Sequence, residues 1–167
     1  MKNIKIVFGN LKMINYYDEM ENVSDDYLKY INNHLKWFKE INRNERFNRI
    51  DFTAIDKKER TVSIETKIRM NNIFTYESTY IEVDKYNNLI EDFKKTGRLP
   101  LFLNFYQNKE HFAIWRLDKM KKLKKITVKI FNPGSQTHEI VERYLLPNFL
   151  SSYYEYDEVN KKYIKKW

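Results

Sequence analysis

The 167-residue chain has no cysteine, only three glycines and only three prolines. Without cysteine it has no disulfides, no thiolate nucleophile and no zinc–thiolate site. With so little glycine and proline there is no evident flexible linker, so we expect a single domain over residues 1–167. No apolar stretch reaches the length of a membrane span, and the run Ile6-Val-Phe8 is too short for a signal sequence. We therefore expect a soluble cytoplasmic protein that does not interact with a membrane.

Positive charge, in contrast, is in excess. The formal net charge is +8 and the isoelectric point is about 9.4. A basic protein favours a polyanionic partner such as nucleic acid, although an AT-biased genome would also enrich lysine. Within the lysine-rich run 119–125, Lys121 and Lys122 are candidate phosphate contacts, and a solvated surface is the alternative interpretation.

Apolar spacing predicts a mixture of helices and strands. The N-cap sequence Ser24-Asp25-Asp26 is followed by apolar residues at helical spacing, which predicts a helix to about Glu40. A second helix is predicted from an N-cap at Asp84 to Gly97. The predicted strands are Arg49–Ile55, Thr61–Ile68, Phe74–Ile81, Pro100–Tyr106, Phe112–Leu117 and Lys125–Phe131. Residues 2–8 could form a strand or an ordered arm, and residues 137–144 a helix or a strand. This order predicts an α/β (α+β) fold with a central mixed sheet flanked by helices.

The most informative residues lie in the first two strands. Strict alternation in Thr61–Ile68 places Glu65 and Lys67 on one face. The turn at residues 56–60 is centred near Lys58, so a hairpin places Asp51 opposite Glu65, with Cβ atoms roughly 4.5–5.5 Å apart. Two carboxylates that close repel each other unless a cation lies between them. The pattern therefore predicts a divalent-metal site. The alternative is a solvated sheet face on which Asp51 is exposed and Glu65 pairs with Lys67 or with an arginine across the strand.

These groups suit the hydrolysis of a phosphodiester bond. Asp51, Glu65 and the backbone carbonyl of Thr66 are hard oxygen ligands for Mg²⁺ or Mn²⁺, which would activate water and polarise a phosphoryl oxygen. Lys67 would stabilise the developing charge or orient the water. Two other Asp-x-Lys tripeptides, at 56–58 and 92–94, fall in a predicted turn and a predicted helix, where the two charged residues would not share a strand face.

The segments Arg49-Ile-Asp51-Phe-Thr53 and Ser63-Ile-Glu65-Thr-Lys67-Ile68 together resemble the core signature of the PD-(D/E)XK, or restriction-endonuclease-like, nuclease superfamily. This superfamily includes archaeal and phage Holliday junction resolvases. The resemblance runs from about residue 24 to 117 and covers the family's helix, three-strand meander, helix and strand. Residues 118–167 would then form a C-terminal extension.

The resemblance implies a Mg²⁺-dependent DNA endonuclease, such as a structure-selective junction resolvase. Asp51 and Glu65 would ligate the metal, and Lys67 would position the attacking water. The helix after the meander would approach DNA. Near its start, Lys85 falls where some members carry a polar residue that supports the site, and we take Lys85 and Arg69 as candidate DNA contacts. If the gene belongs to a phage, the enzyme would act in the host cytoplasm.

The sequence departs from the family pattern in two places. Ile50, not proline, precedes Asp51. Many members also carry a glutamate on the first helix, and here Glu19, Glu21 and Glu40 are all candidates, which leaves the number of metal ions open. Because cleaving two strands usually takes two active sites, we expect a homodimer. A non-catalytic module that binds nucleic acid or protein on the same fold is the alternative function, and RNA is an alternative substrate.

Overall fold

A computed structural model describes residues 10–45, 48–106, 110–132 and 136–167, and for residues 10–21 it describes the backbone alone. The strand or arm expected at residues 2–8 lies outside the described residues. The elements are α1 (Asn10–Leu35), β1 (Phe38–Arg43), β2 (Phe52–Asp56), β3 (Thr61–Arg69), η1 (Ile73–Thr75), β4 (Ser78–Glu82), α2 (Val83–Thr96), β5 (Leu99–Tyr106), β6 (His111–Arg116), η2 (Leu117–Lys119), β7 (Lys124–Asn132), β8 (Thr137–Pro147), η3 (Asn148–Leu150), β9 (Ser152–Asp157) and β10 (Lys162–Lys165).

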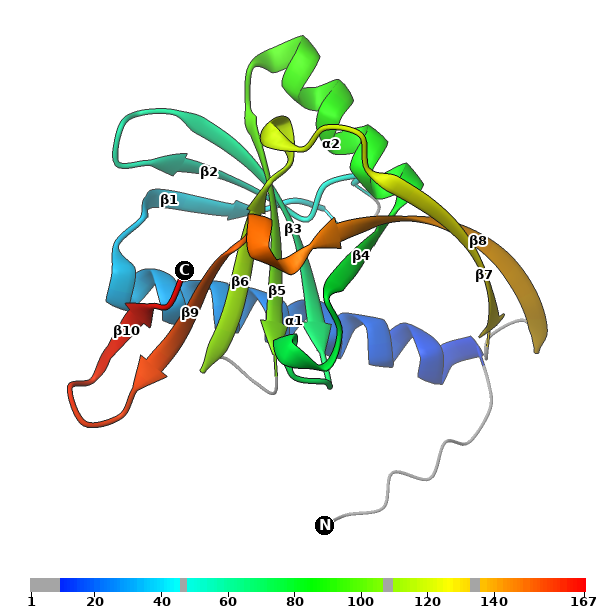
Figure 1. Cartoon of the computed structure of the whole chain (residues 1–167), viewed down its shortest axis with the longest axis horizontal. Helices are drawn as coiled ribbons and strands as arrows, with labels where there is room; N and C mark the ends of the chain where they lie inside the picture. The colour runs from blue at the N-terminus through cyan, green and yellow to red at the C-terminus, as the bar shows by residue number, and fades with distance from the viewer. Residues whose placement is uncertain (1–9, 46–47, 107–109, 133–135) are drawn as a thin grey trace.

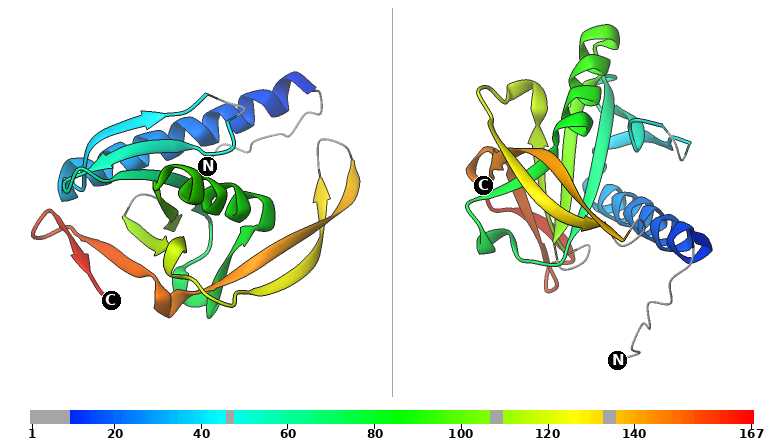
Figure 2. Two further views of the ribbon diagram at one scale, coloured as in Figure 1. Left: turned by 90° about the horizontal axis from the view of Figure 1, so that it is seen from above. Right: turned by 90° about the vertical axis from the view of Figure 1, so that its right-hand side faces the viewer.

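A seven-stranded mixed sheet forms the centre of the molecule (Figure 1), in the order β1-β2-β3-β5-β6-β9-β10. The pair β3–β5 is parallel and its neighbours are antiparallel. The chain returns from β3 to β5 through β4 and α2, as a parallel pair requires. Helix α1 lies along one face of the sheet and α2 along the other (Figures 1 and 2). The predicted mixed sheet with flanking helices is therefore confirmed.

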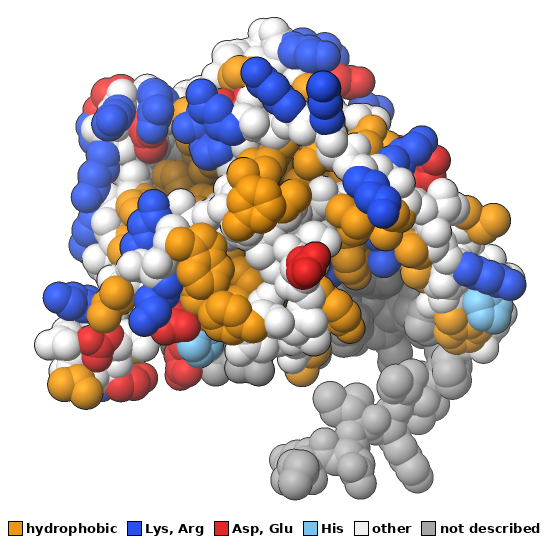
Figure 3. Space-filling model, viewed as in Figure 1, with side chains coloured by type: hydrophobic (Ala, Val, Ile, Leu, Met, Phe, Trp, Pro, Cys, Tyr) orange, Lys and Arg blue, Asp and Glu red, His pale blue; other side chains and the backbone are white. Residues whose placement is uncertain are grey.

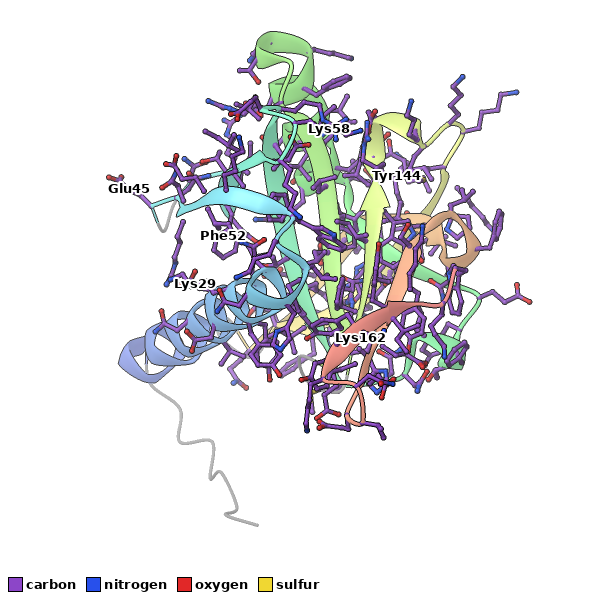
Figure 4. All side chains as sticks on the ribbon, turned by 90° about the vertical axis from the view of Figure 1, so that its left-hand side faces the viewer. Lys29, Glu45, Phe52, Lys58, Tyr144 and Lys162 are labelled. Carbon is purple, nitrogen blue, oxygen red and sulfur yellow. The ribbon has the colours of Figure 1, made fainter. Side chains whose placement is uncertain are left out.

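Each helix covers its own hydrophobic core. On the α1 side, Leu28 and Ile31 pack with Phe52 and Ile64 of the sheet, and Figure 4 shows Phe52 next to α1. On the α2 side, Leu89 packs with Phe102 and Trp115. Strand β3 is buried on both faces over most of its length, because Val62 and Ile64 point into the α1 core while Ser63 and Glu65 are buried on the α2 side. Its second face is thus covered by protein and is not the solvated surface that the sequence allowed.

The first helix differs from the prediction at both ends. It starts at Asn10 rather than Ser24 and ends at Leu35 rather than near Glu40. Lys36 then takes a left-handed conformation with φ 52°, which ends the helix. Asn32 holds the chain after this turn, because its side chain both accepts a hydrogen bond from the Phe38 amide (2.9 Å) and donates one to the Phe38 carbonyl (3.0 Å). Residues 38–43 therefore form an edge strand paired with β2.

This edge strand changes which strands make the three-strand meander. The sequence assigned Arg49–Ile55, Thr61–Ile68 and Phe74–Ile81, but the antiparallel meander is β1-β2-β3. The segment predicted as the third strand begins with the short helix η1, which starts at a cap where Asn72 accepts a hydrogen bond from the Phe74 amide. Strand β4 then joins a second sheet, in the order β4-β8-β7.

The second half of the chain resolves what the sequence left open. Residues 137–147 form strand β8, and the tail adds β9 and β10 to the edge of the main sheet. Helix α2 has its N-cap at Glu82, so Asp84 lies in the first turn instead of at the cap, whereas Gly97 ends the helix with φ 76° as predicted.

Apolar side chains gather at the centre of the face shown in Figure 3, with lysine and arginine around its upper and left edges. Among the described residues, no helix is long and apolar enough to cross a membrane.

The turn between β2 and β3 fixes the register of the hairpin that carries the predicted site. The Asp56 side chain accepts hydrogen bonds from the amides of Lys58 (2.8 Å) and Arg60 (2.9 Å) and from the Arg60 guanidinium (2.7 Å). The ladder that follows pairs Ile55 with Thr61 and Phe52 with Ile64, which is the register expected from the sequence. Lys58 marks this turn at the top of the sheet in Figure 4.

We predict that Asp56→Asn lowers the free energy of unfolding by about 1–3 kcal/mol near neutral pH, because hydrogen bonds to a charged acceptor are lost. Although burial alone would raise the pKa of Asp56, the hydrogen bonds from Arg60 and Lys58 outweigh it and lower that pKa. A carboxyl group with a lowered pKa stabilises the folded state at pH values above the usual carboxyl range. This stabilisation is lost as the pH falls through the pKa of the folded state. Urea unfolding at neutral and acidic pH should therefore show the two proteins converging in acid, and a gap that stays constant would contradict this role.

Candidate active site

Asp51 is held beside β3 where the β2–β3 ladder stops. The last paired residues are Phe52 and Ile64, so no β2 backbone group remains to accept the amide of Thr66. The Asp51 carboxylate takes that place, and its Oδ2 accepts hydrogen bonds from the Thr66 amide (2.9 Å) and hydroxyl (3.1 Å). Because the N–H and C=O of one strand residue point to the same side, the Thr66 carbonyl also lies on the side of Asp51.

Glu65 is the buried member of the carboxylate pair. It is only 6% exposed and faces the layer of α2. Lys85, from the first turn of α2, places its Nζ 2.9 Å from Glu65 Oε1 and 3.6 Å from Asp51 Oδ1. The second oxygen, Glu65 Oε2, is buried and has no hydrogen-bond partner among the described residues. The two carboxylates predicted from the hairpin register therefore meet at one cation.

Lys67 lies at the edge of this pair, on the same face of β3 as Glu65. Its Nζ is 3.7 Å from Glu82 Oε1, and its side chain is 44% exposed. Glu82 is the last residue of β4 and the N-cap of α2. Sequence reasoning missed Glu82 because it took β4 as part of the meander. The signal it could have used is that Glu82 and Lys85 flank the start of one helix.

The pKa values of two ionisable groups in the site, Glu65 and Lys85, are shifted from their usual values. Burial raises the pKa of Glu65 to about 8, and the neighbouring Asp51 adds to the rise while Lys85 and Lys67 oppose it. Burial lowers the pKa of Lys85, but the attraction of Glu65 and Asp51 outweighs burial and raises it overall. A carboxyl group with a pKa near neutrality, in a cluster of opposite charges, is typical of a functional site.

The donor set fits a hard divalent cation. Two carboxylates and a backbone carbonyl, from Asp51, Glu65 and Thr66, are oxygen ligands of the kind that Mg²⁺ and Mn²⁺ prefer. The unpartnered Glu65 oxygen supplies a free ligand position. In the described part of the chain, no group of three or more acidic, histidine or cysteine side chains could hold a metal. Two carboxylates are nevertheless enough for Mg²⁺, which usually keeps several waters.

The remaining candidates fall in different places. Glu40 lies on β1 and accepts a hydrogen bond from Asn42, so it is not a helical acid, and the side chains of Glu19 and Glu21 lie outside the described residues. Lys121 and Lys122 are exposed in the link between η2 and β7. Arg69 is buried at the end of β3 and donates a hydrogen bond to the Tyr80 carbonyl.

Comparison with known proteins identifies the fold. No protein-family model matches the chain, and no curated protein sequence is significantly similar to it. Among solved structures, it is similar to Hjc, a Holliday junction resolvase from the archaeal hyperthermophile Archaeoglobus fulgidus. The match has a TM-score of 0.54 and 13% identity, and covers 87% of this chain and 98% of that one. The chain has the restriction-endonuclease-like fold. At this identity the likeness concerns the fold alone.

Buried Glu65 leads to a testable pH dependence in the metal-free protein. Because its folded-state pKa is raised, the folded state holds the proton more tightly, and stability falls as the pH rises from about 4.5 towards 8. Glu65→Gln should remove this loss, which is on the order of a few kcal/mol. Urea unfolding in EDTA should show the variant gaining stability over the wild type with rising pH. Glu142→Gln, which alters an exposed glutamate, is the matched control, and a wild-type profile for Glu65→Gln would contradict the assignment.

Proposed function

We propose that this protein is a divalent-metal-dependent DNA endonuclease. The observation that carries the proposal is the meeting of Asp51 and Glu65, one buried and one partly exposed, around a single cationic position at the end of the β2–β3 ladder. Carboxylates are expensive to bury as a pair unless a cation compensates them. A lysine on the same strand face, and a basic chain overall, add what a phosphate-containing substrate requires.

Each residue of the site has a distinct role in this proposal. Asp51, Glu65 and the Thr66 carbonyl would hold Mg²⁺ or Mn²⁺, which when bound polarises the phosphoryl oxygen and makes water a better nucleophile. Thr66 also orients Asp51 through its two hydrogen bonds. Lys67, which is half-exposed, is placed to orient the water or to stabilise the charge that develops on the phosphate. Glu82 keeps the Lys67 ammonium close to the pair.

For the substrate we propose branched DNA, cleaved by a junction resolvase of the archaeal or phage type. The similarity to a structure described as a Holliday junction resolvase supports this choice, together with the net charge of +8. Resolving a junction requires cuts in two strands, and the chain carries one such carboxylate pair among its described residues. We therefore propose that it acts as a homodimer.

The proposal predicts Mg²⁺-dependent cleavage that requires the pair and its lysine. We expect Asp51→Asn, Glu65→Gln and Lys67→Ala each to reduce the cleavage rate by at least about 100-fold, because each removes a ligand or a charge that acts in the transition state. The assay compares linear, nicked, forked and four-way DNA, with an RNA duplex as a further arm. Glu142→Gln and Lys125→Ala, which change an exposed ion pair on the second sheet, should retain wild-type rates.

Two results would contradict these assignments. If cleavage survives both Asp51→Asn and Lys67→Ala, these residues do not form the active site. If linear and branched DNA are cleaved equally, the proposed preference for junctions is wrong. Cleavage of the RNA arm alone would keep the site and change the substrate.

Lys85 gives a separate prediction, because its ammonium and a metal ion would compete for the same two carboxylates. Lys85→Met should strengthen Mn²⁺ binding several-fold, since the metal no longer has to displace a positive charge from Glu65 and Asp51. Isothermal titration calorimetry measures this directly, with Asp51→Asn as the variant that should lose binding. Weaker Mn²⁺ binding by Lys85→Met would instead show that Lys85 supports the metal.

One observation favours the alternative of a non-catalytic binding module on the same fold. Lys85 already contacts both carboxylates, so the charges are compensated without a metal. If calorimetry detects neither Mg²⁺ nor Mn²⁺ binding, with or without DNA, the carboxylates have a structural role and the module becomes the better interpretation.

A further inference from the structure

Two arginines share one tyrosine ring beside the candidate active site. Arg69, at the end of β3, lies with its Cζ 4.0 Å from the centre of the Tyr80 ring, and Arg143, on β8, with its Cζ 3.8 Å from the same centre. The two guanidinium groups therefore lie within about 8 Å of each other, where like charges repel. Tyr80 belongs to β4, so three strands from two different sheets meet at this cluster.

Neither arginine is paired with an acid in the part of the chain that the structure describes. Arg69 is only 8% exposed and donates one hydrogen bond from Nη2 to the Tyr80 carbonyl, while its Nε is buried without a partner. The Nε of Arg143 is also buried without a partner. Glu82 is opposite Arg143 in the β4–β8 ladder, but the ion pair that it makes is with Lys67. Buried guanidinium donors without an acceptor are costly, and a bound anion would satisfy them.

The cluster lies in line with the carboxylate pair. Strand alternation puts Glu65, Lys67 and Arg69 on one face of β3, and a two-residue step covers roughly 6.6 Å. On β8, Tyr144 faces α2 and contacts Tyr86, so Arg143 points to the opposite face, which it shares with Tyr80 and Glu82. Strand β4 pairs with β8, and its Tyr80 carbonyl accepts a hydrogen bond from Arg69 of β3, so the three strands meet here.

Beyond Arg143 the β7–β8 hairpin leaves the body of the molecule. Strand β4 pairs with β8 only from Arg143 to Pro147, whereas β7 and β8 continue to pair with each other as far as Asn132 and Thr137. Figure 2 shows this hairpin projecting past β4 on the side where α2 begins. Arg143 thus lies at the base of the projecting hairpin, between it and the candidate active site.

We propose that Arg143 and Arg69, stacked on Tyr80, form a subsite for a backbone phosphate of DNA next to the phosphate that is cleaved. Arg143, the less buried of the two, contacts the phosphate oxygens. Arg69 lies behind it, adds positive potential and positions the Tyr80 strand. The inference rests on the proposed function, because it assigns this anion to the substrate of the Asp51–Glu65 site.

The salt dependence of DNA binding tests this subsite. Fluorescence anisotropy with a fluorescein-labelled four-way junction and a labelled linear duplex, in Ca²⁺ and on the Asp51→Asn background, measures affinity over a series of KCl concentrations without cleavage. Arg143→Gln should weaken binding about tenfold at low salt and reduce the slope of log affinity against log salt by about one, the value for one phosphate contact. Arg143→Lys should keep the slope and lose part of the affinity, because it keeps the charge but not the two-pronged geometry.

Arg60→Gln is the matched control. It removes an arginine at the other end of β3 whose charge is paired with Asp56, and it should leave the slope unchanged. A folded Arg143→Gln protein with wild-type affinity and slope overturns the subsite and gives the arginines a structural role only. If Arg143→Gln does not fold, Arg143→Lys decides, because an affinity equal to that of the wild type overturns the proposal.

The outcomes separate this inference from the proposed function. If the wild type cleaves DNA and Arg143→Gln changes neither the affinity nor its salt dependence, the nuclease function is supported and the subsite is wrong. If binding depends on Arg143 but no cleavage occurs with any divalent metal, Arg143 is a phosphate contact, whereas the nuclease function and the placing of this contact next to a cleaved phosphate are both wrong. If the wild type binds neither DNA probe, both are wrong.

Discussion

The meeting of Asp51 and Glu65 at the Lys85 ammonium is the interaction that links the fold of this protein to its candidate active site. Glu65 is buried under α2, so its charge can be neutralised only by a proton or by a nearby cation. The negative charge of Asp51 repels that of Glu65 and so makes a neighbouring cation more necessary. The Asp51 carboxylate is itself held in place by the hydrogen bond from the Thr66 amide. The start of α2, the end of β4 and the register of the β2–β3 hairpin must all be correct for these groups to meet. The fold and the site are therefore coupled through a few charges.

The part of the site that local geometry determines could be predicted from the sequence. Counting residues outward from a turn centred near Lys58 places Asp51 opposite Glu65. The turn stabilised by the Asp56 side chain gives the hairpin this register. Alternation along β3 correctly groups Glu65 with Lys67. These predictions succeed because the residues are close in sequence and a strand allows only two faces.

The rest of the site depends on contacts that local patterns do not reveal. Lys85 reaches the carboxylates only because α2 packs across β3. Glu82 and Arg143 belong to paired strands of the second sheet, which places them near the site. Local spacing does not predict that sheet, because residues 74–81 alternate like a meander strand. In the structure, the Asn148 side chain donates hydrogen bonds to the Ile73 and Tyr76 carbonyls and ties the segment to the end of β8. The sequence predicts the end of a helix where β1 begins, because Leu35 and Phe38 continue the helical spacing. Pairing with β2 overrides that local preference.

In the proposed enzyme, Asp51 and Glu65 together hold a divalent metal ion. The most direct measurement is a crystal structure of the protein grown with Mn²⁺, using the anomalous signal of manganese. We predict an anomalous peak bonded to oxygens of both carboxylates, with the Lys85 ammonium displaced from between them. An ordered Lys85 that still bridges Glu65 and Asp51, with no manganese peak beside either, would contradict it.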